Sequence, residues 1–303
     1  MPFDRDQRDA DKRADRLMNQ LERALIREYR AAVKTIQAEL AQLYDTLPMS
    51  PAQRMERRRL ANILFQIEQE MTRLYQSNRD TLLERLQAIY RDMYYMTGWA
   101  IEQELGGAQL AWGLLNPEVI QAAVLAPIDR LTLDDRLERN RRRIVRAIQQ
   151  SLTQGLILGE AYEDMAKRIR GVLEQDARKA RTVARTEGHR IRNQGRLDSA
   201  RRAKELGIEV VKVWDATLDS RTRPAHRRLD GVAVGVDEDF NSPAGGKGPA
   251  PGNLDKAEDD INCRCTFRLQ IKGYAPTVRR TREGLIPYQT YEQWAKERGI
   301  PLN

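Results

Sequence analysis

The sequence predicts a mainly α-helical protein with a smaller α+β domain at its C-terminal end. Two long segments near the N-terminus carry apolar residues every three or four positions, which is the period of a helix. Residues 208–214 are instead β-branched and partly alternating, as strands are. The mean hydropathy of −0.68 and the 32% of charged residues favour elongated helices with much exposed surface. We therefore expect a long N-terminal helical hairpin, followed by a basic helix that packs on a small antiparallel sheet.

The hairpin occupies the first predicted domain, residues 1–105. Residues 3–47 contain neither Gly nor Pro, and their apolar stripe predicts one helix. The segment Pro48-Met49-Ser50-Pro51 interrupts it, with Ser50 as N-cap and Pro51 as the first position of the next helix. That second helix is predicted to last to Gly98. Two long helices joined by a short turn are typical of an antiparallel pair.

The second predicted domain, residues 106–175, is a helical connector. Gly106-Gly107 predicts a hinge, and Asn116 can cap a helix that begins at Pro117. An arginine-rich helix is expected over residues 132–154. After Gly155 and Gly159, a short separate helix is expected around residues 161–173.

The third predicted domain, residues 176–303, opens with a basic helix at 177–206 that ends at Gly207. Residues 178–204 hold ten Lys or Arg and two acids. A dense positive surface of this kind can neutralise DNA phosphates without reading sequence. The residues predicted to contact double-stranded DNA are Arg178, Lys179, Arg181, Arg190, Arg192, Arg196, Arg201 and Arg202.

Short strands follow this helix. Residues 208–214 and 232–236 are expected to be strands, and the Gly- and Pro-rich residues 241–252 a long loop without regular structure. Residues 263–269 are read as a returning strand whose two cysteines point to the same face. The segment 288–298 predicts a final short helix.

The net charge, hydropathy and cysteine content of the chain limit the classes of function that we expect. The net charge of +8 makes a polyanion a plausible neighbour, although an Arg-rich solvated helical surface is the alternative. No apolar run reaches the length of a membrane span, and the first residues lack the apolar stretch of a signal peptide. Two cysteines do not make a disulfide framework, which fits a reducing cytosol.

Several short sequence motifs between residues 184 and 267, called words below, occur in a recognisable order. They are Ala184-Arg185-Thr186-Glu187, the stretch from Trp214 to His226, Leu229-Asp230-Gly231, Phe240 and Cys263-Arg264-Cys265. In this order they resemble the head-morphogenesis domain of tailed bacteriophages, the phage Mu F-like family. The resemblance implies a structural motif made of Arg185, Glu187, Trp214, Asp219, Arg221, His226, Gly231, Cys263 and Cys265.

The same resemblance implies a function. Proteins of this kind are minor capsid proteins that act with the portal protein in procapsid assembly and in DNA packaging or ejection. Scaffold and major capsid proteins are further expected partners, and no membrane is involved. We expect the chain inside the virion head near the portal, and in the host cytoplasm during assembly.

Three groups of residues suggest chemical functions as alternatives to a purely structural role. His226, Cys263 and Cys265 could ligate zinc, with Asp230 or His189 as a fourth ligand, although C-x-C is not the usual knuckle spacing. The alternative is that both cysteines are packing residues and His226 bonds Asp219 or Asp230. We predict no cofactor and leave zinc open.

The same cluster with its acidic neighbours could instead serve a metal-dependent nuclease. Arg185 and Glu187 resemble residues used by ADP-ribosyltransferases, but no Ser-Thr-Ser word lies between them. The segment Gly245-Gly246-Lys247-Gly248 does not match a phosphate-binding loop. We therefore predict that the protein is not an enzyme and has no catalytic residues.

Overall fold

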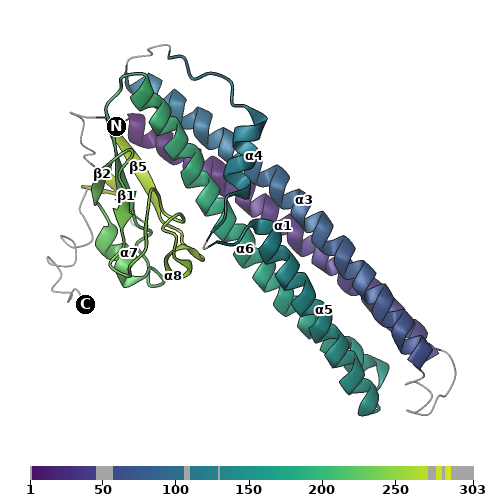
Figure 1. The fold of residues 1–303 in the computed structure, drawn as a ribbon. Helices are drawn as coiled ribbons and strands as arrows, with labels where there is room; N and C mark the ends of the chain where they lie inside the picture. The colour runs from purple at the N-terminus through teal and green to yellow at the C-terminus, as the bar shows by residue number, and fades with distance from the viewer. Residues whose placement is uncertain are drawn as a thin grey trace. The chain divides into compact units, whose positions relative to one another are not determined.

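The computed structural model describes residues 2–45, 57–105, 110–128, 130–271, 278–281 and 284–287. It confirms a mainly helical chain with a small antiparallel sheet toward the C-terminus (Figure 1). The predicted turn at residues 48–51, the Gly106-Gly107 hinge and the helix at 288–298 lie outside the described residues. Among the helices described, none is long and apolar enough to cross a membrane.

The two predicted long helices are α1 (Pro2–Asp45) and α3 (Arg57–Glu104). Arg13 near the start of α1 donates to Asp92 near the end of α3 at 2.8 Å. Farther along α1, Glu28 accepts from Ser77 at 3.3 Å. The residue numbers rise on one helix as they fall on the other, which confirms the antiparallel pair.

The next two helices begin where capping chemistry predicts. In α4 (Pro117–Leu125), the side chain of Asn116 accepts from the backbone of Glu118 at 2.9 Å. In α5 (Leu133–Ile157), Thr132 and Asp135 form a reciprocal capping box. Such boxes satisfy amide groups that the first turn of a helix leaves unbonded.

One helix, α6 (Tyr162–Glu205), replaces the two predicted between residues 161 and 206. Gly171 lies inside it, and a Cβ added there would meet nothing within 4 Å. A glycine in a helix costs about 1 kcal/mol relative to alanine, while Ile169 and Leu173 on either side are buried. Packing of the apolar stripe thus carries the helix through the glycine. It ends at Gly207, whose φ is 85°, as predicted.

The main sheet has the order β2-β1-β5 and is antiparallel. Its strands are β1 (Val210–Asp215), β2 (Ala233–Gly235) and β5 (Thr266–Ile271). In the register, Val213 pairs with Ala233 and Trp214 with Phe267. Two short helices accompany this sheet, α7 (Pro224–Leu229) and α8 (Ala257–Asp260).

The Gly- and Pro-rich segment is more regular than predicted. It contains a two-stranded ladder of β3 (Phe240–Asn241) and β4 (Lys247–Gly248). A Cβ on Gly248 would lie 1.8 Å from the carbonyl oxygen of Asn253, so the backbone there approaches its neighbour too closely for any side chain. The glycines thus permit a folded hairpin. A further pair, β6 (Val278–Thr281) and β7 (Gly284–Pro287), follows in the chain.

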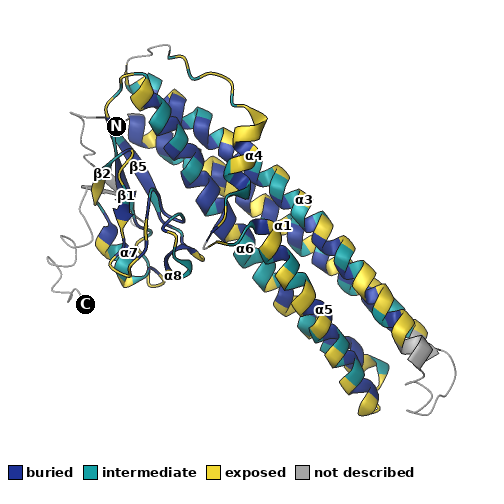
Figure 2. Cartoon of the chain, in the orientation of Figure 1, coloured by how far each residue is buried: buried dark blue, intermediate teal, exposed yellow. Residues whose placement is uncertain are grey.

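The chain divides into two compact units, each built from separated segments. Unit 1 comprises residues 1–18, 85–130 and 185–303, and unit 2 comprises residues 19–84 and 131–184. These units cut across the three consecutive domains expected from the sequence, because α1, α3 and α6 each run through both. Figure 2 shows buried positions recurring along each long helix.

Unit 1 contains the sheet and its core. Trp214, Phe240 and Phe267 are fully buried there, together with Phe3 of α1 and Leu197 of α6. The sequence words that resemble the Mu F-like domain from Arg185 onward all lie in this unit.

Candidate functional site

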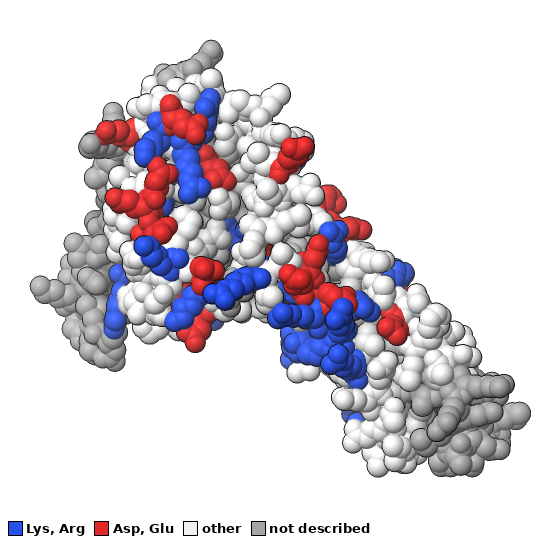
Figure 3. Space-filling model, viewed as in Figure 1, with Lys and Arg blue, Asp and Glu red and all other residues white. Residues whose placement is uncertain are grey.

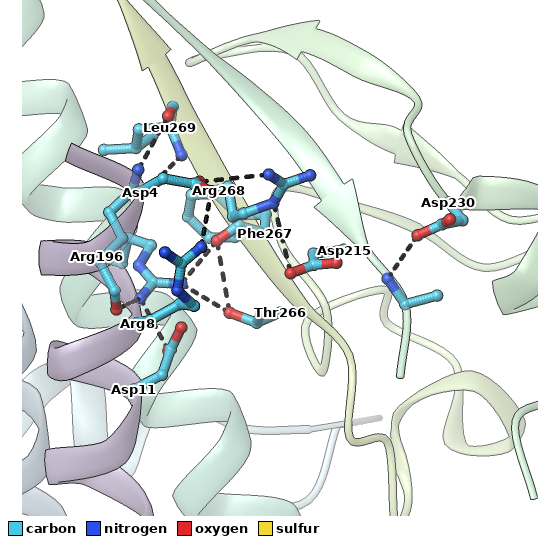
Figure 4. A network of polar contacts seen from close by, with 12 residues as sticks. Asp4, Arg8, Asp11, Arg196, Asp215, Asp230, Thr266, Phe267, Arg268 and Leu269 are labelled. Carbon is cyan, nitrogen blue, oxygen red and sulfur yellow. Dashed lines mark hydrogen bonds and ion pairs between the residues drawn. The ribbon is translucent and has the colours of Figure 1, made fainter. Parts of the chain in front are cut away.

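Arg196 of α6 joins three elements of unit 1 (Figure 4). Its guanidinium donates to the carbonyl of Phe267 at 2.6 Å and to the hydroxyl of Thr266 at 2.7 Å, both on β5. On the other side it donates to Asp11 of α1 at 2.8 Å. The Arg196 side chain has no exposed surface, so its charge is neutralised entirely within the fold.

Gln7 of α1 completes this junction by bonding the edge of β5. Its amide nitrogen donates to the carbonyl of Leu269 at 3.1 Å, and its amide oxygen accepts from the Leu269 backbone at 2.8 Å. The side chain therefore occupies backbone groups that an edge strand would otherwise leave open for another chain. Nearby, Asp4 accepts from Arg268 of β5 at 3.3 Å (Figure 4).

The Arg-Thr-Glu word lies at the start of the unit 1 part of α6. Glu187 is fully buried and accepts from Arg190 at 2.9 Å. Arg190 in turn donates to the carbonyls of Ala123 and Val124 at 3.0 and 2.8 Å. Thr186 accepts from the backbone of Asn262 at 3.0 Å. These contacts tie α6 to α4 and to the segment that precedes β5.

Asp219 organises the turn after β1. It accepts from both guanidinium nitrogens of Arg264, at 2.6 and 2.7 Å, and from the backbone of Arg221 at 2.9 Å. The hydrogen bonds from Arg264 hold the pKa of Asp219 well below its usual range. The Arg221 side chain is largely exposed.

Gly231 is a further motif residue whose backbone conformation is constrained. Its φ of 78° is one that side chains disfavour, and its amide donates to the carbonyl of Trp214 at 2.9 Å.

His226, Cys263 and Cys265 come together in one buried cluster. Nδ1 of His226 lies 3.6 Å from Sγ of Cys263 and 3.5 Å from Sγ of Cys265. The three side chains are at most 2% exposed. Both cysteines face His226, as the shared face predicted for them requires, but they precede β5 and do not lie within it.

The other ring nitrogen of His226 faces a buried carboxylate. Nε2 lies 3.2 Å from Oδ1 of Asp259, on α8. Asp259 also accepts from the hydroxyl of Ser242 and from the backbone of Gly246, both at 3.1 Å. The partners expected for His226 from the sequence were Asp219 or Asp230, and Asp259 was not among them. Asp219 binds Arg264, and Asp230 accepts from the backbone of Ala216 at 2.9 Å.

The pKa shifts in this cluster arise because its titratable side chains are buried and lie close to one another. Burial lowers the pKa of His226, but the adjacent Cys265 sulfur and Asp259 outweigh burial and raise it overall. A hydrogen bond from Cys263 lowers the pKa of Cys265, while the same interaction raises that of Cys263. Of the two thiols, Cys265 is therefore the more acidic.

The residues predicted to contact DNA fall into two groups. Arg190, Arg192 and Arg196 are buried, and bond to carboxylates or carbonyls within unit 1. This corrects the expectation for these three, because a phosphate has no access to them in this structure.

The other five reach solvent to different extents. Arg178 is exposed, and Lys179, Arg181, Arg201 and Arg202 are half-buried. Arg181 pairs with Glu22, Arg201 with Asp198 and Arg202 with Glu205. For these five, contact with DNA stays a prediction.

Comparison with known proteins settles the family. The chain is 35% identical over 307 residues to the minor head protein GP7 of Bacillus phage SPP1, and the match covers 98% of this chain and 99% of that protein. The chain belongs to the Phage Mu protein F like family. The model of this family matches residues 146–268, which contain the Arg-Thr-Glu word and the His226 cluster. The predicted resemblance to phage head-morphogenesis proteins is thus confirmed.

Two other relatives share parts of the sequence. A protein of Enterococcus faecalis named NAD(+)--arginine ADP-ribosyltransferase EFV is 30% identical over 241 residues, covering 78% of this chain and 49% of that protein. An uncharacterized protein of Haemophilus influenzae is 28% identical over 118 residues, which is 39% of this chain and 23% of that protein. No solved structure matches the chain.

Proposed function

We propose that this chain is a minor head protein of a tailed phage or prophage, which acts with the portal protein in procapsid assembly and in DNA packaging or ejection. The observation that carries the proposal is the extent of the match to the SPP1 minor head protein, which spans nearly the whole of both chains. A relation through one shared module would leave the long helices unmatched. Scaffold and major capsid proteins are further candidate partners, and the head interior near the portal is the proposed location.

The contacts of the Arg-Thr-Glu word support a structural role over an enzymatic one. The Enterococcus relative carries an enzyme name, but the match spans only about half of that protein. Glu187 is buried and its carboxylate bonds Arg190, so neither a dinucleotide nor an arginine substrate can reach it in this arrangement. We therefore propose that the chain has no ADP-ribosyltransferase activity of its own.

A DNA-contacting surface is best placed on unit 2. Arg139, Arg142, Arg143 and Arg146 of α5 are exposed, and so is Arg178 of α6. Figure 3 shows Lys and Arg side chains gathered over these two helices. Part of this charge is balanced, since Glu138 accepts from Arg142 at 2.7 Å. Contacts of this type are independent of sequence and weaken with salt.

Quantitative mass spectrometry of procapsids and DNA-filled particles tests the proposal, with particles made in the presence and absence of this gene and of the portal gene. We expect a few to a few tens of copies of the chain per particle, on the order of the portal's own copy number, and loss of the chain when the portal is deleted. Absence of the chain from both particle types overturns the proposed role. Its retention without the portal overturns the portal partnership.

A further inference from the structure

We propose that His226, Cys263 and Cys265 bind one zinc ion that fastens the loops of unit 1 together. The proposal is independent of the role in head assembly, because it rests on the geometry of this cluster alone. The three ligand atoms, one from each side chain, all lie within 4.8 Å of one another.

The spacing of these atoms matches tetrahedral zinc coordination. Zinc lies about 2.3 Å from thiolate sulfur and about 2.0 Å from imidazole nitrogen, which places a sulfur and a nitrogen ligand about 3.5 Å apart at the tetrahedral angle. The two sulfur-to-nitrogen distances here are 3.6 and 3.5 Å. Both sulfur-to-nitrogen distances therefore fit one zinc ion bonded to His226 and to the cysteines.

A hydrogen bond to Nδ1 of His226 accounts for only one of the two sulfurs at this distance. Nδ1 of His226 has one lone pair and can accept one hydrogen, yet two sulfurs lie equally close to it. A disulfide between cysteines two residues apart would be strained, and both cysteines are free thiols. A single cation bonded to all three atoms satisfies the lone pair and both sulfurs together.

The partner of the other ring nitrogen supports the same assignment. A histidine that binds a metal commonly donates its second N–H to a carboxylate, which fixes the tautomer and aims the free nitrogen at the metal. Asp259 lies in that position, 3.2 Å from Nε2. A Cβ on Gly246 would lie 2.4 Å from Oδ2 of Asp259, so the hairpin backbone closes directly over this carboxylate. The Trp214 ring also packs against the imidazole in a T-shaped arrangement.

The donor set selects zinc among common cations. Two thiolates and one imidazole suit zinc and exclude magnesium and calcium, which take oxygen ligands. Among the described residues the cluster contains three ligands, so neither Asp230 nor His189 is the protein's fourth. Water takes the fourth position. Since the three side chains are buried, the ion links α7 to the segment before β5 and, through Asp259, to α8.

Metal content of the purified full-length chain, measured after equilibration with zinc and removal of the excess, tests the proposal. We expect about one zinc per chain in the wild type and less than about one tenth in the Cys263→Ser/Cys265→Ser variant. Phe267→Leu is the control, because Phe267 is buried in the same core and supplies no ligand. It should keep about one zinc despite lower stability. Equal zinc in the wild type and the double variant overturns the proposal.

A second measurement covers the case in which the double variant fails to fold. Cobalt(II) is added to the folded wild type, and its absorption spectrum is recorded. Tetrahedral thiolate coordination gives intense visible bands and a sulfur-to-cobalt charge-transfer band, which zinc should then abolish. If the folded wild type shows neither band and retains no zinc, the cysteines are packing residues only and the proposal is wrong.

Discussion

The two halves of α6 use the same kind of residue in opposite ways. In residues 162–184, which belong to unit 2, Arg178 is exposed and Lys179 half-buried. In residues 185–205, which belong to unit 1, Arg190 and Arg196 are buried and bond carbonyls of other elements. The density of positive charge along the helix is similar in both halves. Basic residues on a helix thus mark a nucleic-acid surface only where no other element covers them.

The largest expected effect is on the folding stability of unit 1. Replacing Arg196 with Met should destabilise the chain by about 3 kcal/mol, because the carbonyl of Phe267 and the carboxylate of Asp11 lose their buried partner. The matched control is Arg178→Met in the other half of the helix, which should change stability by about 0.5 kcal/mol or less. Urea unfolding followed by circular dichroism measures both. Similar small losses for the two variants would contradict the contrast between the halves.

A second prediction concerns binding to double-stranded DNA. Replacing Arg178 and Lys179 together with Ala should reduce the magnitude of the negative slope of log affinity against log salt by about 2, since each lost phosphate contact removes about 0.9. The comparison variant, Arg201→Ala/Arg202→Ala, should reduce the magnitude of the slope by less than about 1, because Asp198 and Glu205 already pair with these arginines. Fluorescence anisotropy at several salt concentrations gives the slopes. An unchanged slope for the first variant removes this part of α6 from the DNA-contacting surface.

The smallest effect is a pH dependence in unit 2. Asp176 accepts from the hydroxyls of Tyr29 and Tyr75, both at 2.7 Å, and burial raises the pKa of Asp176 above its ordinary value of 3.8. Between 3.8 and the higher folded value, the folded chain binds more protons than the unfolded chain. The contribution of protonated Asp176 to folding stability is therefore present at low pH and is lost as the pH rises through this window.

The variant Asp176→Asn isolates this contribution. The wild type should lose stability relative to the variant as the pH is raised from about 4 to about 7, by less than about 1.5 kcal/mol in total. Urea midpoints of the two proteins at each pH give the difference directly. A wild type that gains relative to the variant over this range would mean that the two tyrosines stabilise the carboxylate more than burial disfavours it.

Local chemistry explains which parts of the fold could be read from the sequence. Asn116 caps α4 as predicted, because a cap bonds amides only two or three residues away, whereas the cap that Thr132 provides for α5 was not predicted. The prediction divided residues 161–206 into two helices, whereas the buried residues Leu173 and Asp176 on either side of the expected break belong to one continuous helix. The ladder of β3 and β4 was missed, because glycines signal turn residues and do not reveal which backbones approach each other.

The sequence by itself determined the family, the helical hairpin, the strands of the main sheet and the three residues of the His226 cluster. The hairpin and the strands rest on periodicity, which is a property of neighbouring residues, and the family rests on a resemblance carried by short motifs. Only the tertiary structure decided that Asp259 is the partner of His226, and that Arg190, Arg192 and Arg196 point inward. The physical reason is that burial and long-range hydrogen bonds join groups far apart in the chain. The sequence alone does not show whether a charged side chain lies in solvent or in the core.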